Sequence, residues 1–432
     1  MKMDQDIVAD WASGGVVALT GRAGGPPLVP PGRAATYARE LADLIGELTV
    51  GAHAPVRVDG PALLAERAAF TARFRSGRTS VGGACRLLPT ADGWAAVSCA
   101  RPDDPSLLGA LVGAPLAGDP WEVVTEWLRG HSGDELAQRC ELLGLAAGPV
   151  RPPAAHAPVT QPASRARVGS LAAQRNVAPP LVPRPVEGLL VVDFSALWAG
   201  PLCAHLLGLA GARVVKVETP SRPDGARRGQ PDFYRLLHAG HRSVVLDPDT
   251  SAGRRALVAL VDAADIVIEA SRPRALARFG LDAQAAVAAG TTWVSVTAAG
   301  RASARVGFGD DVAASAGLVA PEVDGTPLFC GDAIADPLTG LAAAARALTA
   351  PADGGGFLHD VAMSEVVAGT LDHSADPLPA ARARRSGTGW VVEAARGHVP
   401  VAAPRRRETS GRAPGMGEDT TEVLRGLGIP SP

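Results

Sequence analysis

The stretch from Leu189 to Glu218, LLVVDFSALWAGPLCAHLLGLAGARVVKVE, decides the fold of this chain. Residues 189–194 form an apolar run of strand length, and residues 201–209 have helical spacing and open with proline, which suits the first helical turn. Gly211 ends that helix, and residues 213–218 form a second strand. Two strands joined by one short helix predict a right-handed βαβ unit and therefore a parallel sheet.

The alternation of strands and helices continues downstream. Further apolar runs predict strands at 243–246, 265–269 and 293–297, with helices at 252–262 and 274–289 between them. This order is typical of a doubly wound, Rossmann-like parallel sheet. The front half also mixes the two patterns: helices are expected at 34–48 and 121–143, and a strand at 93–99. We therefore predict an α/β fold with a second, smaller α/β domain.

The chain divides into five expected segments. Residues 148–186 are rich in Pro, Ala and Arg and lack periodicity, which favours an extended linker. The segments are a degenerate repeat of the later helical segment (1–69), a small α/β domain (70–150), the linker (151–185), the Rossmann-like domain (186–370) and an irregular C-terminal segment (371–432).

The composition of the 432 residues bounds the class of protein. Lys and Arg number 42 and Asp and Glu number 44, for a formal net charge of -2, so no nucleic-acid partner is expected. No apolar run reaches the length of a membrane span, and the first residues lack the apolar core of a signal peptide. The 5 cysteines are scattered and form no CxxC pair, which fits a reducing compartment. We expect a soluble cytoplasmic protein.

An internal repeat links the two halves. Gly25–Thr36 (GPPLVPPGRAAT) aligns without gaps to Gly325–Asp336 (GTPLFCGDAIAD), and Ser13–Ala18 resembles Ser315–Ala320. Chance similarity between Gly-, Pro- and Ala-rich segments is the alternative. If the repeat is real, Thr36 stands in the first copy where the second has Asp336.

Asp336 is the first candidate for chemistry. It precedes the helical run LTGLAAAARAL, so one interpretation is an N-cap that accepts a hydrogen bond from the first turn. The other interpretation is an open nucleophile, which the helix N-terminus holds ionised and which small neighbours leave accessible.

The carboxyl edge of the predicted sheet is the second candidate. The turn 198–201 lies between the first strand and its helix, where open α/β sheets bind ligands, and an ordinary tight turn is the alternative. Arginines follow several strands and could gather around phosphates there, although surface arginines are common in this Arg-rich chain. Neither a dinucleotide fingerprint nor a P-loop is present. The 9 histidines are scattered, so no metal site is predicted.

Several ordered motifs resemble one known family. VEGLLVVDFSALWAGPLCAHLLGLAGARVVKVETP is followed by HAGHRSVVLD, ADIVIEASRPRALARFGL, TWVSVTAAG and GDAIADPLTGL. Together they resemble the family III CoA-transferases, the formyl-CoA transferase and carnitine CoA-transferase group that also includes the α-methylacyl-CoA racemases. The tail APGMGEDTTEVLRGLG is similar to the C-terminal signature of this family.

The resemblance implies a mechanism and its residues. Asp336 matches the nucleophilic aspartate, which attacks an acyl-CoA thioester to give a mixed anhydride and then an aspartyl-CoA thioester. Contacts with coenzyme A are implied for Leu197, Trp198 and Ala199, for His241 and Arg242 of the HRS turn, and for Arg278. The substrates would be an acyl-CoA and a carboxylic acid, with no bound cofactor, and the protein would be a homodimer.

Three departures from the family pattern stand out. The family's Lys in the HRS turn is His241 here, and its Asn before the RP motif is Ala270. Residues 92–99, 121–128 and 142–149 resemble the small domain that normally follows the catalytic helix, yet here they precede the sheet. The chain therefore looks permuted.

Two other functions compete with CoA transfer. A racemase of this family uses a His in a GHD-type segment, but the matching segment 309–311 reads Gly-Asp-Asp. A non-catalytic CoA-binding protein would fit the permutation and the lost first-copy aspartate. The intact GDAIADPLTG motif favours the transferase.

Overall fold

The computed structural model describes residues 6–51, 55–116, 118–151, 180–271, 273–371 and 380–432. Most of the predicted linker, residues 152–179, lies outside the described residues. Within the part that is described, no helix combines the length and the apolar character needed to cross a membrane.

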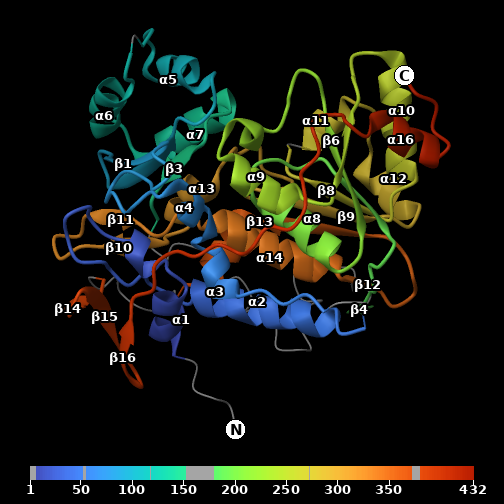
Figure 1. Ribbon diagram of the computed structural model, residues 1–432. Coiled ribbons are helices and arrows are strands. Elements are labelled where there is room, and N and C mark those ends of the chain that lie inside the picture. Colours follow the sequence, from blue (N-terminus) through green and yellow to red (C-terminus); the bar gives the residue numbers. More distant parts are fainter. Residues whose placement is uncertain (1–5, 52–54, 117, 152–179, 272, 372–379) are drawn as a thin grey trace.

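A 6-stranded parallel sheet forms the centre of the molecule (Figure 1). The spatial order reverses between the first and the fourth strand of the sheet in chain order, which is the Rossmann-like arrangement, and ligands of such sheets bind beyond the carboxyl ends of the strands at that point. The α/β, doubly wound fold class is confirmed. In spatial order the strands are β7 (Arg242–Val245), β6 (Arg213–Glu218), β5 (Leu190–Asp193), β8 (Ile266–Glu269), β9 (Thr292–Thr297) and β13 (Phe357–Ala362).

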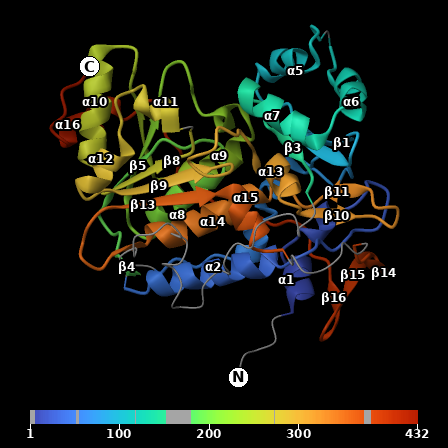
Figure 2. The same cartoon turned by 180° about the vertical axis from the view of Figure 1, so that it is seen from behind.

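Helices cover both faces of this sheet because each buried strand is apolar on both sides. Val191 packs with α8 (Ala199–Leu209) and α14 (Ala335–Ala347), and Val192 packs in the core on the opposite face. Figures 1 and 2 show the two helix layers with the sheet between them. The second layer consists of α10 (Ser251–Asp262), α12 (Ala283–Ala288) and α16 (Thr420–Gly426).

The front residues add a further layer on the α14 side. There α2 (Ala34–Leu48) packs against α14, and residues from Trp11 to Val81 share one continuous core with the sheet. Figure 2 shows α2 beneath α8 and α14. Three short helices accompany it: α1 (Ile7–Ser13), α3 (Gly60–Leu63) and α4 (Glu66–Thr71).

Residues 85–149 form a small α/β unit beside this body. Its antiparallel sheet packs against α13 (Gly309–Ser315), with Ala96 and Ala314 in one apolar cluster. The strands are β1 (Cys85–Pro89), β2 (Trp94–Ser98) and β3 (Ala147–Pro149), and the helices are α5 (Asp104–Val112), α6 (Trp121–Arg129) and α7 (Gly133–Leu143).

The two segments of the sequence repeat have the same order of elements. The helices α1 and α13 come first, and α2 and α14 come last. Between α13 and α14, β10 (Val319–Pro321) pairs with β11 (Pro327–Phe329), which places Ala320 opposite Leu328. At the matching place in the first copy, the Leu28 amide donates to the Thr20 carbonyl at 3.0 Å.

The C-terminal segment 371–432 is not irregular throughout, so that expectation is wrong. Gly387 and Gly397 have φ values of 58° and 115°, which permit two tight turns and a three-stranded antiparallel sheet. Its strands are β14 (Arg384–Ser386), β15 (Gly389–Ala394) and β16 (Gly397–Pro400). Asp419 accepts from the Ser243 amide at 2.8 Å and so fixes the start of α16 to the edge strand β7.

Two predicted helices are each divided in two. The expected helix 274–289 is α11 (Pro273–Ala277) and α12, because Gly280 takes a left-handed φ of 84° between them. The expected helix 121–143 is α6 and α7, with Ser132 capping the second at the break. The last two short strands, β4 (Leu181–Pro183) and β12 (Thr349–Pro351), pair with each other.

Candidate functional site

Asp336 is the second residue of α14 and not its N-cap, so the capping interpretation is wrong. The N-cap is Ile334, and no side chain caps the helix there. Ala333, with a left-handed φ of 47°, turns the chain into the helix, and Asp310 Oδ1 accepts from its amide at 2.8 Å. Because this neighbouring helix supplies the acceptor at the turn, the Asp336 carboxylate is left without a capping role.

Two glycines bring other elements against this turn. A Cβ atom on Gly309 would lie 2.5 Å from Asp336 Oδ2 and 2.4 Å from the Ala333 carbonyl oxygen, so only glycine fits at the start of α13. A Cβ atom on Gly340, one turn after Asp336, would lie 2.7 Å from the Ala199 carbonyl oxygen. The start of α14 is therefore held between α13 and the first turn of α8.

Asp336 belongs to an acidic cluster that the sequence did not predict. Asp310 and Asp332 lie close together beside Gly82, and Asp311 is buried on the same helix as Asp310. Arg67 of α4 provides the positive charge: its Nε donates to Asp332 Oδ2 at 2.9 Å, and its second bond goes to Oδ1 of the same carboxylate.

Arg67 also joins this cluster to the turn before α8. Its guanidinium carbon lies 5.3 Å from the centre of the Trp198 ring, which itself meets Phe233 edge-on at 5.2 Å. Sequence analysis missed Arg67 because it lies 265 residues before Asp332 and outside the family-like segment. No local motif marks it, so only the tertiary structure could reveal it.

Burial sets the protonation of these carboxyl groups. It raises the pKa of Asp336 to about 7, against the opposing charge of Arg67 and with support from Asp310. Burial also raises the pKa of Asp310 and of Asp311 to about 6. Burial and the neighbouring carboxylates therefore act against the ionised form of Asp336 that was expected at the helix N-terminus.

The turn before α8 is shaped by a buried lysine. Lys216 Nζ lies 3.1 Å from Asp224 Oδ2 and also donates to the Ser195 carbonyl oxygen. Asp224 Oδ1 accepts from the Leu197 amide at 3.0 Å, where Leu197 has a left-handed φ of 71°. A lysine inside the apolar strand RVVKVE was the sequence signal for this network.

The predicted coenzyme A residues differ in accessibility. Leu197 is 41% exposed at the turn, whereas Trp198 and Ala199 are buried beneath it. Arg278 is exposed and has no hydrogen bond or ion pair within the described residues. The turn at Leu197 directly follows the carboxyl end of β5, whereas Arg278 follows α11, the short helix that comes after β8.

The HRS turn is placed differently. His241 is buried beside His238 and His205, and burial lowers its pKa to about 3, so it is neutral. Arg242 is paired with Asp419 and Glu422 of the C-terminal segment. Of the predicted basic contacts, Arg278 is therefore the one whose charge is both exposed and uncompensated within the described residues.

Comparisons with known proteins identify the relationship of the second half. Residues 186–396 match the family model for CoA-transferase family III. Succinate–glutarate CoA-transferase of Agrobacterium fabrum is 31% identical over 211 residues, which cover 43% of this chain and 53% of that protein. Succinyl-CoA–D-citramalate CoA-transferase of Chloroflexus aurantiacus is 31% identical over 182 residues, which cover 39% and 45% respectively.

The match has clear limits in extent. The chain spans about half the length of these two curated relatives. A crystal structure of a CAIB/BAIF family protein from Brucella suis is 26% identical, covers 50% of this chain and 65% of its own, and has a TM-score of 0.42. The resemblance to family III CoA-transferases is thus confirmed for residues 186–396, and residues before 186 lie outside the family match.

Proposed function

We propose that this chain is a CoA-transferase that moves coenzyme A from an acyl-CoA donor to a carboxylic acid, with Asp336 as the nucleophile. One observation carries the proposal: within the family-matching segment, Asp336 stands at the start of α14 with its carboxylate against Gly309 and keeps part of its surface exposed. With a pKa of about 7, the ionised form of Asp336 is accessible near neutral pH.

The proposed reaction has four balanced steps. The Asp336 carboxylate attacks the thioester carbonyl, the carbon–sulfur bond breaks, and CoA thiolate leaves a mixed anhydride. The thiolate then attacks the aspartyl carbonyl, releasing the donor acid as its carboxylate and leaving an aspartyl-CoA thioester. The acceptor carboxylate attacks this thioester to form a second anhydride and thiolate. Finally the thiolate attacks the acceptor carbonyl, which releases the new acyl-CoA and restores Asp336.

The residues around Asp336 support these steps in distinct ways. Gly309 lets the start of α13 pack closely against the Asp336 carboxylate, since any side chain there would clash with Oδ2. Arg67 opposes the rise in the Asp336 pKa and so favours the ionised nucleophile. The exposed Arg278 and the Leu197 turn are proposed to contact coenzyme A beyond the carboxyl ends of β5 and β8.

Intact mass measurement tests the proposal. The protein is incubated with acetyl-CoA, succinyl-CoA and formyl-CoA, and the spectrum is searched for an adduct of CoA joined as a thioester with loss of water. We expect the adduct on the wild type and its loss in Asp336→Asn. Asp324→Asn, an exposed aspartate on the β10–β11 turn, is the matched control and should still form it.

Two outcomes would favour the alternatives. Exchange of the α-proton of a 2-methylacyl-CoA with deuterated water, without CoA transfer, would favour a racemase. Tight CoA binding without adduct, transfer or exchange would favour a non-catalytic CoA-binding protein.

A further inference from the structure

A second site lies between the small α/β unit and the main body. Here a cavity of about 530 Å³ separates α7 and β3 from the loop before α13 and from the start of α15 (Met363–Ala368). This volume is within the range of small-molecule sites. Apolar walls come from Ala137, Leu145, Ala147, Pro149 and Ala316.

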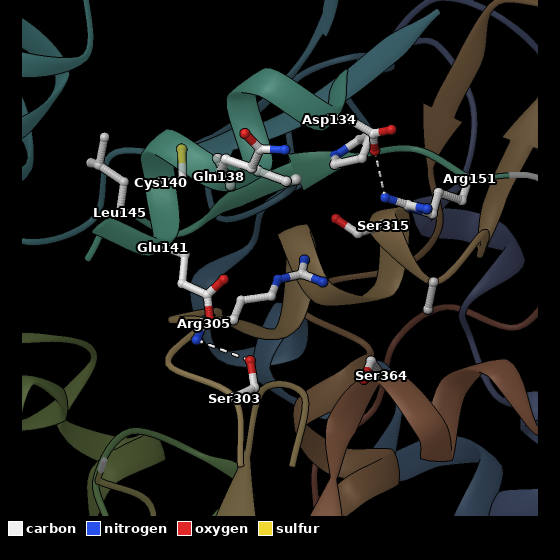
Figure 3. Close-up of a pocket in the computed structure, with 15 residues that line it drawn as sticks. Asp134, Gln138, Cys140, Glu141, Leu145, Arg151, Ser303, Arg305, Ser315 and Ser364 are labelled. Atoms are coloured by element: carbon white, nitrogen blue, oxygen red, sulfur yellow. Dashed lines mark hydrogen bonds and ion pairs between the residues drawn. The ribbon is translucent and has the colours of Figure 1, made fainter. Parts of the chain in front are cut away.

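Each charged side chain that lines this cavity has a hydrogen-bond partner, with one exception. Arg151 bonds Asp134 at 2.8 Å, and Glu141 accepts from the Ala304 amide at 3.0 Å. The guanidinium of Arg305 has no hydrogen bond or ion pair with any described residue, and its Nε and Nη2 atoms are buried. Figure 3 shows Arg305 reaching across the cavity toward Ser315.

An unpaired guanidinium in such a place is costly unless an anion meets it. Asp311 lies within electrostatic range of Arg305 but forms no ion pair with it: its Oδ1 accepts from Ser98 and from the Phe308 amide, and its buried Oδ2 has no hydrogen-bond partner among the described residues. The chain therefore leaves the strongest donor of the cavity open to a ligand.

We propose that this cavity binds a small monocarboxylic acid with an apolar body, whose carboxylate is held by the Arg305 guanidinium. A planar guanidinium matches one carboxylate, and the apolar walls match a hydrocarbon chain. A second carboxylate or a doubly charged phosphate would be repelled by Glu141, which lines the cavity and forms no ion pair within the described residues, whereas Asp134 is paired with Arg151.

This site is distinct from the one proposed for CoA transfer. Asp336 and the predicted coenzyme A contacts do not line the cavity. Gly309 contacts Asp336 at one end of α13 and Ser315 faces the cavity at the other, six residues or roughly 9 Å along the helix. Between Gly309 and Ser315 on α13, the buried Asp311 accepts a hydrogen bond from Ser98 of β2 at 2.9 Å, so β2 packs against this part of the helix.

Isothermal titration of the full chain with four probes tests the proposal: butyrate, acetate, glutarate and inorganic phosphate. We expect butyrate to bind more tightly than the other three. Acetate lacks the apolar body, and glutarate and phosphate carry the extra charge. Wild-type protein that binds no butyrate, or that binds glutarate or phosphate at least as tightly, would overturn the proposal.

Three variants connect binding to the named residues. Arg305→Gln should weaken butyrate by about tenfold or more, the loss expected for one charge-assisted hydrogen bond. Arg305→Lys keeps the positive charge but not the two parallel N–H donors of the guanidinium, and it should lose less butyrate affinity than Arg305→Gln. Gly148→Ala should also weaken binding, because its new Cβ would lie 2.9 Å from both Arg305 Nη2 and Ser315 Oγ.

The controls separate this site from folding defects and from the proposed active site. Arg139→Gln removes an arginine of α7 that stacks on Trp127 and does not line the cavity, so butyrate affinity should stay within about twofold. Saturating CoA and the Asp336→Asn change should leave butyrate affinity unchanged. Competition by CoA, or unchanged affinity in Arg305→Gln with an unaltered melting temperature, would contradict the inference.

Discussion

At the scale of single residues, the chemistry depends on how burial changes the charge of Asp336. Its pKa of about 7 lies above the value of an unfolded Asp, so the folded state favours the protonated form. Stability from this group is therefore fully present below the unfolded pKa and is lost as the pH rises through about 7. The ionised form proposed to attack a thioester is thus the form that folding disfavours.

Asp336→Asn should abolish transfer and yet stabilise the fold at pH 8. One pKa unit corresponds to about 1.4 kcal/mol, and partial exposure reduces the benefit to roughly 1–3 kcal/mol. Urea unfolding at pH 5 and pH 8 measures it: the gain should appear at pH 8 and shrink at pH 5. A gain in unfolding free energy that is equal at pH 5 and pH 8 would show that Asp336 is not buried as described.

Arg67→Met should shift the pH dependence of transfer. Without the guanidinium the pKa of Asp336 rises further, so the alkaline-rising limb of the kcat profile should move to higher pH. The buried Asp332 also loses its ion pair, which costs about 3–5 kcal/mol. The double variant Arg67→Met with Asp332→Asn should recover stability but only part of the pH profile, because Asp332 raises the Asp336 pKa less than Arg67 lowers it, and full recovery of both would limit Arg67 to a structural role.

Arg278→Ala should weaken coenzyme A by the loss of one charge-assisted contact, worth roughly 1.5–3 kcal/mol. Calorimetry with CoA and with dephospho-CoA measures this loss. The deficit should be smaller for dephospho-CoA if Arg278 reaches the ribose 3′-phosphate. Unchanged affinity for both ligands would remove Arg278 from the site.

At the scale of helices and strands, close backbone contact positions the nucleophile. Gly309→Ala should reduce transfer at least 100-fold, because its Cβ would overlap the Asp336 carboxylate and the Ala333 backbone. Gly93→Ala is the matched control: a Cβ on Gly93 meets nothing within 4 Å, and transfer should be unchanged. Steady-state kinetics on both purified variants measures the effect, and similar transfer rates for Gly309→Ala and Gly93→Ala would contradict this geometry.

The sequence predicted the elements whose pattern is local. The strands at β5, β6, β8 and β9 and the helices α8 and α2 lie within a few residues of their expected ranges. β13 was missed because His359 and Asp360 interrupt its apolar pattern. In the site, Asp336 was found by family resemblance, whereas Arg67 and Asp310 could not be, since their roles arise from contacts between distant segments.

At the scale of the whole molecule, the front half completes the body instead of forming a detachable module. Trp11 and Ile45 lie in the same continuous core as Val191 of the sheet, and α2 covers α14. The front also supplies Arg67 to Asp332, so the surroundings of Asp336 are assembled within one chain. The homodimer expected from the family resemblance remains a prediction, which sedimentation equilibrium can measure directly.

Residues 180–432 expressed alone should fail to give a stable, active protein. Loss of the front exposes the α14 face that α2 covers and leaves Asp332 without Arg67, so aggregation is expected. Co-expression of 1–151 with 180–432 as two chains should restore a soluble complex and transfer activity, because the core contacts do not require a covalent connection. Co-purification, circular dichroism and the transfer assay measure the outcome. The same two-chain complex carrying Arg67→Met tests the contribution of the front to the site. A stable, fully active 180–432 fragment would show that the front half has a separate role.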